Sequence, residues 1–193
     1  MSAAEKSAER QHHRLPGDPH PEEEVERMIR VDHAGEYGAV RIYDGQLAIL
    51  GRAKAGATIR AMAEQERRHL AEFDRLVAAQ RVRPTLLSPL WHAAGFALGA
   101  ASALMGERAA MACTVAVEEV IDEHYRRQSE ALAYQPGERE AALRRSIDEF
   151  RADELEHRDV ALAHGASEML GYEIFSAAVK AGSRLAIWLS TRL

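Results

Sequence analysis

The 193-residue sequence predicts an all-α protein that folds as a four-helix bundle. Three observations support this prediction. Aromatic residues make up only 6% of the chain, whereas Ala, Leu, Glu and Arg dominate, and these residues favour helix over sheet. Apolar residues recur at helical spacing in four long segments. Turns that contain Gly or Pro pair these segments into two hairpins.

The length and the 47% content of hydrophobic residues suit one compact domain with a full core, which we expect to span residues 21–193. Residues 1–20 are polar and contain Pro, so we expect a disordered N-terminal tail. This tail lacks the apolar stretch of a secretory signal, and it contains acidic residues that a mitochondrial presequence usually lacks. The net charge of −5 and the absence of a basic stripe predict no nucleic-acid partner.

The first hairpin should begin near Pro21, a residue suited to the first turn of a helix, and its first helix should run to about Leu50. The apolar stripe of this helix passes through Asp32 and Glu36, so Glu36 is expected inside the bundle. After a Gly-bearing turn at 51–56, a second helix carries its own apolar stripe. Glu66 and His69 share that face because they are three residues apart.

The second hairpin repeats this pattern. In the third helix apolar residues flank Glu118, and after a breaker at 135–137 apolar residues of the fourth helix flank Glu154 and His157. Glu118 lies about 27 Å of helix before the turn and Glu154 roughly 26 Å after it, at 1.5 Å per residue. The ligand-type residues of the two helices are therefore expected at one height.

Between the hairpins, residues 84–106 contain no Asp, Glu, Lys or Arg over 23 positions. We expect this segment to be the long crossover that some bundles use between their halves. Its Gly, Pro and Ala content argues against a membrane-spanning helix. We favour an interfacial or partly inserted apolar surface, with Trp91 near the lipid headgroups and Arg81 and Arg83 beside these headgroups; a buried crossover is the alternative. Residues 172–193 predict a further, C-terminal helix.

Four glutamates and two histidines carry the functional signal, in the order Glu36, Glu66-x-x-His69, Glu118 and Glu154-x-x-His157. Each lies on an apolar stripe, where an uncompensated charge is costly. A bare Glu-x-x-His is weak, since Glu9 and His12 in the tail also match it. The ordered set is the arrangement by which ferritin-like carboxylate bundles hold two metals. Oxygen-rich ligation with one histidine per metal favours iron or manganese over structural zinc, and iron is the metal we expect.

Other residues are less certain members of the site. Asp32, Asp122 and Asp153 could each accept a proton from a metal-bound histidine, or could be ordinary surface carboxylates. Tyr125 follows Glu118 on the stripe and could line a substrate pocket, although a buried tyrosine with a satisfied hydroxyl is the alternative. Three histidines are expected to be core or surface residues, namely His33, His92 and His164. Cys113, the only cysteine, is expected to be a packing residue and points to a reducing compartment.

The stretches around these residues resemble a known family over about residues 26–193. They read IRVDHAGEYGA at 29–39, RVRPT at 81–85, PLW at 89–91, GFALGA at 95–100, ACTVAVEE at 112–119 and DELEH at 153–157. Together they closely resemble the 3-demethoxyubiquinol 3-hydroxylases of ubiquinone biosynthesis, of the Coq-seven or Cat-five type. The resemblance implies that the six residues above are iron ligands, with Glu66 and Glu154 bridging. It also implies that His124 and Tyr125 aid electron transfer from the quinol.

The resemblance further implies hydroxylation of a polyprenylated 2-methoxy-5-methyl-1,4-benzoquinol by O2 at a carboxylate-bridged di-iron centre, with NADH or the quinol as electron source. Expected partners are the quinol, the membrane surface and a lipid-presenting Coq protein. The expected location is the cytoplasmic side of a bacterial inner membrane. Three alternatives remain: a ferritin-like protein of iron oxidation or storage, a di-iron hydroxylase of another lipid or of a tRNA base, and a membrane-associated scaffold.

Overall fold

The computed structural model describes residues 20–135 and 137–193, and within these ranges it contains helices and no strand. The long helices are α2 (Pro21–Leu50), α3 (Gly56–Gln80), α4 (Ser88–Leu104), α5 (Glu107–Leu132), α6 (Glu138–Ala163) and α7 (Tyr172–Ser190), with a short 3-10 turn η1 (Ala166–Glu168) before α7. The prediction of an all-α bundle with a crossover segment and a C-terminal helix is confirmed. The expected tail at 1–20 lies, apart from His20, outside the described residues, as does Pro136 of the second turn.

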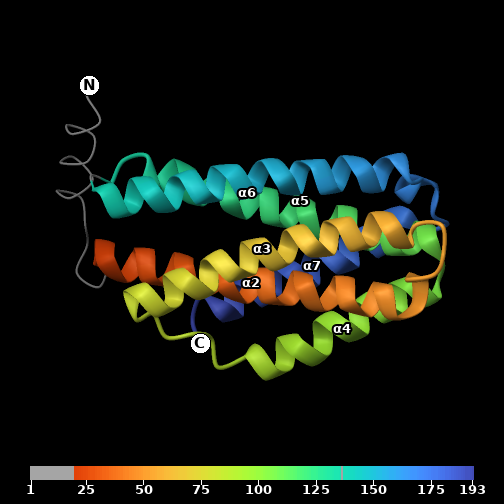
Figure 1. Cartoon of the computed structure of the whole chain (residues 1–193), viewed down its shortest axis with the longest axis horizontal. Coiled ribbons are helices and arrows are strands. Elements are labelled where there is room, and N and C mark those ends of the chain that lie inside the picture. Colours follow the sequence, from red (N-terminus) through yellow and green to blue (C-terminus); the bar gives the residue numbers. More distant parts are fainter. Residues whose placement is uncertain (1–19, 136) are drawn as a thin grey trace.

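The four bundle helices form two hairpins, α2 with α3 and α5 with α6, which lie face to face (Figure 1). Helix α4 lies outside the bundle, along α2, and α7 packs mainly on α5. The C-terminus returns to the start of α4, where the backbone N–H of Leu86 donates to the carbonyl oxygen of Leu193 at 3.3 Å. Helices α2, α4, α5 and α7 therefore enclose a second interior beside the bundle core.

Helix α2 begins where the sequence predicts. Pro21 occupies the first turn, and three glutamates follow it, where the helix dipole favours negative charge. One of these, Glu23, accepts a hydrogen bond from the backbone N–H of His20 at 3.1 Å. The N-terminal end is therefore fixed by local contacts, as well as by packing of Val25 and Ile29 further along the helix.

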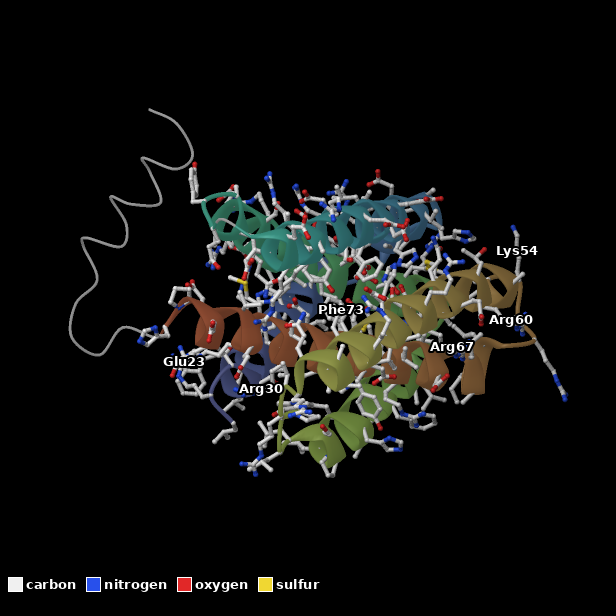
Figure 2. All side chains as sticks on the ribbon, turned by 60° about the vertical axis from the view of Figure 1, so that its left-hand side comes forward. Glu23, Arg30, Lys54, Arg60, Arg67 and Phe73 are labelled. Carbon is white, nitrogen blue, oxygen red and sulfur yellow. The ribbon has the colours of Figure 1, made fainter. Side chains whose placement is uncertain are left out.

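Two apolar clusters fill the bundle, one toward each end. The first includes Tyr43, Ile59 and Met111; the second includes Ile29 and Phe73. Figure 2 shows Phe73 directed into the bundle, whereas Lys54 at the α2–α3 turn extends outward. Each of the four bundle helices contributes residues to both clusters, and one glutamate of each helix lies between them, namely Glu36, Glu66, Glu118 and Glu154. The glutamates are therefore enclosed between two layers of hydrophobic side chains.

The apolar segment 84–106 becomes α4, which packs with one face and exposes the other. Its glycines lie against α2, because a Cβ at Gly99 would collide with the carbonyl oxygen of Ile42 and one at Gly95 would lie 2.9 Å from that of Gly38. On the other side Leu90 is 51% exposed and Leu104 is 73% exposed. The segment thus combines part of the buried crossover with part of the apolar surface expected from the sequence. No helix in the described part of the chain is both long and apolar enough to span a bilayer.

Candidate metal centre

The six predicted ligand residues converge from four helices at the middle of the bundle. Helix α2 supplies Glu36, α5 supplies Glu118, and the spacing of three residues turns both members of each Glu-x-x-His pair of α3 and α6 inward. All six are buried, with at most 1% of their surface exposed. The structure therefore brings together every residue that the sequence assigns to the cluster.

The six residues form two overlapping groups, each with one ligand atom per residue within 4.8 Å of the others. One group contains Glu36 and His69, the other contains Glu118 and His157, and Glu66 and Glu154 belong to both. Each group could hold one metal ion. A carboxylate that belongs to both groups can contact two ions at once, so the geometry agrees with the bridging roles that the family resemblance implies for Glu66 and Glu154.

The ligand atoms face one another without hydrogen bonds. His157 Nδ1 lies 3.0 Å from Glu66 Oε1, and His69 Nδ1 lies 3.2 Å from Glu154 Oε1. Both Nδ1 atoms, both oxygens of Glu66 and of Glu154, and one oxygen each of Glu36 and Glu118 are buried and have no hydrogen-bond partner in the described part of the chain. Unpaired buried carboxylates are costly, whereas two divalent cations would neutralise four of them. The donor set therefore fits a pair of metal ions.

Protons and cations compete for these atoms. Burial, followed by the charge of neighbouring glutamates, raises the pKa of Glu66 and of Glu118 well above 4.5, and burial also raises that of Glu154. Burial alone would lower the pKa of His69, but the carboxylates of Glu154 and Glu36 raise it to about 12. The pKa of His157 rises for the same reason, through Glu66 and Glu118. The cluster therefore favours positive charge, which protons or metal cations could supply.

The two histidines of the cluster are oriented by residues of the opposite hairpin. His69 Nε2 lies 3.0 Å from Asp153 Oδ2, and His157 Nε2 lies 3.0 Å from Gln65 Oε1. With Nε2–H donating to these oxygens, Nδ1 is left free to bind a metal. The expectation for Asp153 is confirmed. Gln65 precedes Glu66 just as Asp153 precedes Glu154, so its role could have been predicted from this repeat in the sequence.

Neither Asp122 nor Asp32 contacts a histidine of the cluster, so for both the first of the two expected roles is wrong. Asp122 accepts a hydrogen bond from Arg151 at 2.6 Å, and Asp32 contacts His124 and Gln128. Four residues advance a helix by about 40° beyond a full turn, so residues four positions from a ligand face a neighbouring element and not the ligand histidine. The sequence pattern placed them on the right side of the helix without fixing what they contact.

Two buried tyrosines hold the outer glutamates. The hydroxyl of Tyr125 donates to Glu36, as does that of Tyr43 to Glu118 Oε1 at 2.8 Å. Burial and then the charge of these glutamates raise both tyrosine pKa values well above 10, so both hydroxyls remain donors. The role of Tyr43 could have been predicted, because it follows Glu36 by seven residues, as Tyr125 follows Glu118.

A cavity of about 370 Å³ lies between α2, α4, α5 and α7 and reaches this cluster at Glu36. Its walls are mainly apolar or glycine, and Trp91 and Ser190 lie on its lining, joined by a hydrogen bond of 3.0 Å from the indole N–H. His124 and Tyr125 also line it, which places both residues named by the resemblance beside one ligand, Glu36.

The three histidines that the sequence predicts to be core or surface residues lie outside the cluster. His33 pairs with Asp74, His92 with the hydroxyl of Tyr37 and His164 with Thr58. Cys113 is buried, and burial raises the pKa of its thiol to about 12. The prediction that Cys113 is a packing residue is confirmed.

Comparison with known proteins gives a consistent result. The model of the family described as ubiquinone biosynthesis protein COQ7 matches residues 23–190. A 3-demethoxyubiquinol 3-hydroxylase of Rhodospirillum rubrum is 57% identical over 181 residues, which cover 93% of this chain and 84% of the relative. The human NADPH-dependent 3-demethoxyubiquinone 3-hydroxylase, a mitochondrial protein, is 52% identical over 88% of this chain and 78% of its own length. The yeast mitochondrial 5-demethoxyubiquinone hydroxylase is 41% identical over 88% of this chain and 78% of its own length.

Proposed function

This chain belongs to the family of the ubiquinone biosynthesis protein COQ7, and on that premise we propose that it is a monooxygenase that hydroxylates 3-demethoxyubiquinol with O2. The observation that carries the proposal is the pair of overlapping ligand groups, joined by Glu66 and Glu154, at the end of a mainly apolar cavity. A metal site without an adjoining cavity would store or bind ions, whereas a site that opens onto one can act on an organic substrate.

Iron is the metal we propose, held by Glu36, Glu66, His69, Glu118, Glu154 and His157. Carboxylate oxygens with one imidazole per ion suit ferrous iron better than structural zinc. A bound pair of ferrous ions would supply the reduction of O2 that hydroxylation requires. The chain keeps the ligands in place through Tyr43, Tyr125, Asp153 and Gln65, and it excludes water with an apolar cluster on either side of the site.

The cavity supports a quinol ring as the substrate. Glycines at 35, 38 and 95 leave space along α2 and α4, and Ile42, Leu98 and Ile121 provide apolar contact for a ring. A ring in this space lies beside Glu36, and His124 and Tyr125 are the polar side chains that we propose to contact it. The source of electrons in the proposal is a reduced nicotinamide nucleotide or the quinol itself; several mitochondrial relatives are named as NADPH-dependent.

We further propose peripheral attachment to the cytoplasmic side of a bacterial inner membrane. The support is the exposed apolar surface of α4 and α7, where Leu90, Leu104, Leu185 and Trp188 are each more than half exposed. Arg81 and Arg83 are exposed beside the start of α4 and would face anionic headgroups. A polyprenyl tail would remain in the bilayer while the ring enters the cavity. A lipid-presenting Coq protein is a further proposed partner for this surface.

The test combines product formation and metal content. Reconstituted with ferrous iron, a reductant and O2, the protein should convert 3-demethoxyubiquinol to the hydroxylated quinol and hold about two irons per chain. Glu66→Ala should abolish turnover and most of the iron, because Glu66 belongs to both ligand groups. Glu36→Ala removes a ligand of one group only and should retain about half of the iron.

Three results would contradict the proposal. Full iron retention in Glu66→Ala would exclude the assigned cluster. Iron uptake and oxidation with no quinol product would favour the iron-storage alternative, and product only from another substrate would favour a different di-iron hydroxylase.

A further inference from the structure

A polar triangle lies beside the metal cluster and takes no part in it. Asp32 Oδ1 lies 2.8 Å from Gln128 Nε2 and 3.0 Å from His124 Nε2, and the two nitrogens are 2.9 Å apart. None of the three residues belongs to either ligand group. A buried polar group of this kind requires its own explanation.

The members of the triangle differ in access. Both residues line the cavity, but the side chain of Asp32 has no exposed surface, whereas that of His124 is 21% exposed. The Nδ1 atom of His124 makes no hydrogen bond within the described part of the chain, and this atom is not buried. A molecule in the cavity can therefore reach the imidazole of His124 but not the carboxylate of Asp32.

The hydrogen-bonding partners in the triangle decide which nitrogen of His124 carries the proton. An ionised carboxylate only accepts hydrogen bonds, and an amide nitrogen only donates them. The imidazole is the one group of the triangle whose nitrogen can be either a donor or an acceptor, depending on its tautomer. If His124 Nε2–H donates to Asp32, Nδ1 carries the lone pair and is an acceptor. If instead Gln128 donates to Nε2, Nδ1 carries the proton and is a donor.

We propose that Asp32 is a positioning residue that holds His124 with its proton on Nε2, so that Nδ1 accepts a hydrogen bond from a hydroxyl of the quinol ring. This inference rests on the proposed function and extends it to recognition of the reduced substrate. A quinol offers hydroxyl donors, whereas the corresponding quinone offers only acceptors. The triangle thus gives the cavity a preference for the reduced ring.

The experiment compares two redox-inert probes in the iron-loaded protein without O2. One is a short-tailed methoxy-methylphenol, which donates a hydrogen bond, and the other is its methyl ether, which cannot. The parent should bind the phenol about tenfold more tightly or better, since one hydrogen bond is worth about that much. Asp32→Asn should reduce the ratio of the two dissociation constants to within about threefold, with the iron content unchanged.

Controls separate positioning from general damage. Asp122→Asn removes a carboxylate that contacts Arg151 outside the cavity and should keep the parent's ratio. His124→Gln should also reduce the ratio, and the double variant with Asp32→Asn should lower it no further, because Asp32 acts through His124. The added bulk of the methyl group in the ether probe should affect binding to all variants alike. The quantity to compare between variants is therefore the ratio of the two dissociation constants.

Each outcome has a distinct meaning. An unchanged ratio in Asp32→Asn, or additive effects in the double variant, overturns the inference and leaves the proposed function intact. A parent that prefers the ether also overturns it, whether or not Asp32→Asn folds, since Nδ1 would then be a donor. A parent that binds neither probe and forms no hydroxylated quinol overturns the proposed function and the inference with it.

Discussion

At the scale of single residues, Glu66 and Glu154 occupy equivalent positions in the two hairpins, and so do the residues before them. Gln65 orients the histidine of the second hairpin, and Asp153 orients that of the first. Each half of the cluster therefore depends on both hairpins. Correct ligand geometry requires that the hairpins dock in one register, and metal binding in turn should stabilise that docking.

This coupling predicts how pH affects stability. Glu66, Glu118 and Glu154 have folded-state pKa values above 4.5, and His69 and His157 have values above 6.5. A raised pKa contributes stability that is full below the unfolded value and is lost as pH rises through the folded value. The metal-free protein should therefore lose stability as pH rises from about 4.5 through neutrality.

The iron-loaded protein should respond differently, because its ligands bind metal in their deprotonated forms. We expect the gap in melting temperature between the iron-loaded and the chelator-treated protein to widen between about pH 5.5 and pH 8. Each proton displaced over one pH unit is worth about 1.4 kcal/mol, or about 3–6 °C in melting temperature for a chain of this length. Anaerobic thermal unfolding at both pH values measures the gap. A gap that is constant or narrows with pH would contradict the assigned cluster.

At the scale of elements, the contact between α2 and α4 depends on glycine. Gly95 and Gly99 of α4 and Gly45 of α2 let the two backbones touch, since a Cβ at Gly99 would overlap Ile42 and one at Gly45 would overlap Phe96. The glycines that make this segment a poor membrane span are thus explained by packing. The contact also sets the width of the cavity, which lies along the same two helices.

Replacement of Gly99 tests this contact. Gly99→Ala should destabilise the protein by about 1–3 kcal/mol, because the added methyl group meets the rigid backbone of α2. Gly35→Ala is the matched control: its Cβ would meet no atom within 4 Å, and alanine should stabilise α2 by up to about 1 kcal/mol. Urea unfolding of both variants gives the comparison. Equal effects would mean that α4 shifts freely on α2.

At the scale of the whole molecule, the apolar surface lies on α4 and α7, and Figure 1 shows α4 at the edge of the molecule opposite α6. Metal ligands come from α2, α3, α5 and α6 and from neither of the surface helices. Membrane attachment and chemistry should therefore be separable by mutation.

The double variant Leu90→Asp/Phe96→Asp tests this separation. Each charge placed in a membrane interface costs about 2 kcal/mol or more, so liposome binding should weaken by at least about thirtyfold. Turnover of a long-tailed quinol should fall, while turnover of a short-tailed quinol should survive. Leu162→Asp on α6 is the control, since Leu162 is 37% exposed on a helix outside the surface. Unchanged liposome binding in the double variant would exclude α4 as the attachment surface and leave α7.

The sequence by itself determined the helices and the members of the cluster. Pro21 as the start of α2, the Gly-bearing turn after Leu50 and the apolar periodicity are local signals, and the spacing of three residues in Glu66-x-x-His69 and Glu154-x-x-His157 fixes a shared face. These properties depend on residues within a turn or two of one another. A helix therefore expresses them wherever it packs.

Only the tertiary structure decided what those faces meet. Three aspartates on the bundle helices have different kinds of partner: Asp153 pairs with His69, Asp122 with Arg151 and Asp32 with His124. Each partner depends on how far the helix is rotated about its own axis. A rotation of a few tens of degrees would exchange one partner for another. The close crossing at Gly99 and the cavity beside Glu36 arise only when α4 and α7 dock on the bundle. Contacts between distant helices are set by packing of the whole, which the local pattern of the sequence does not specify.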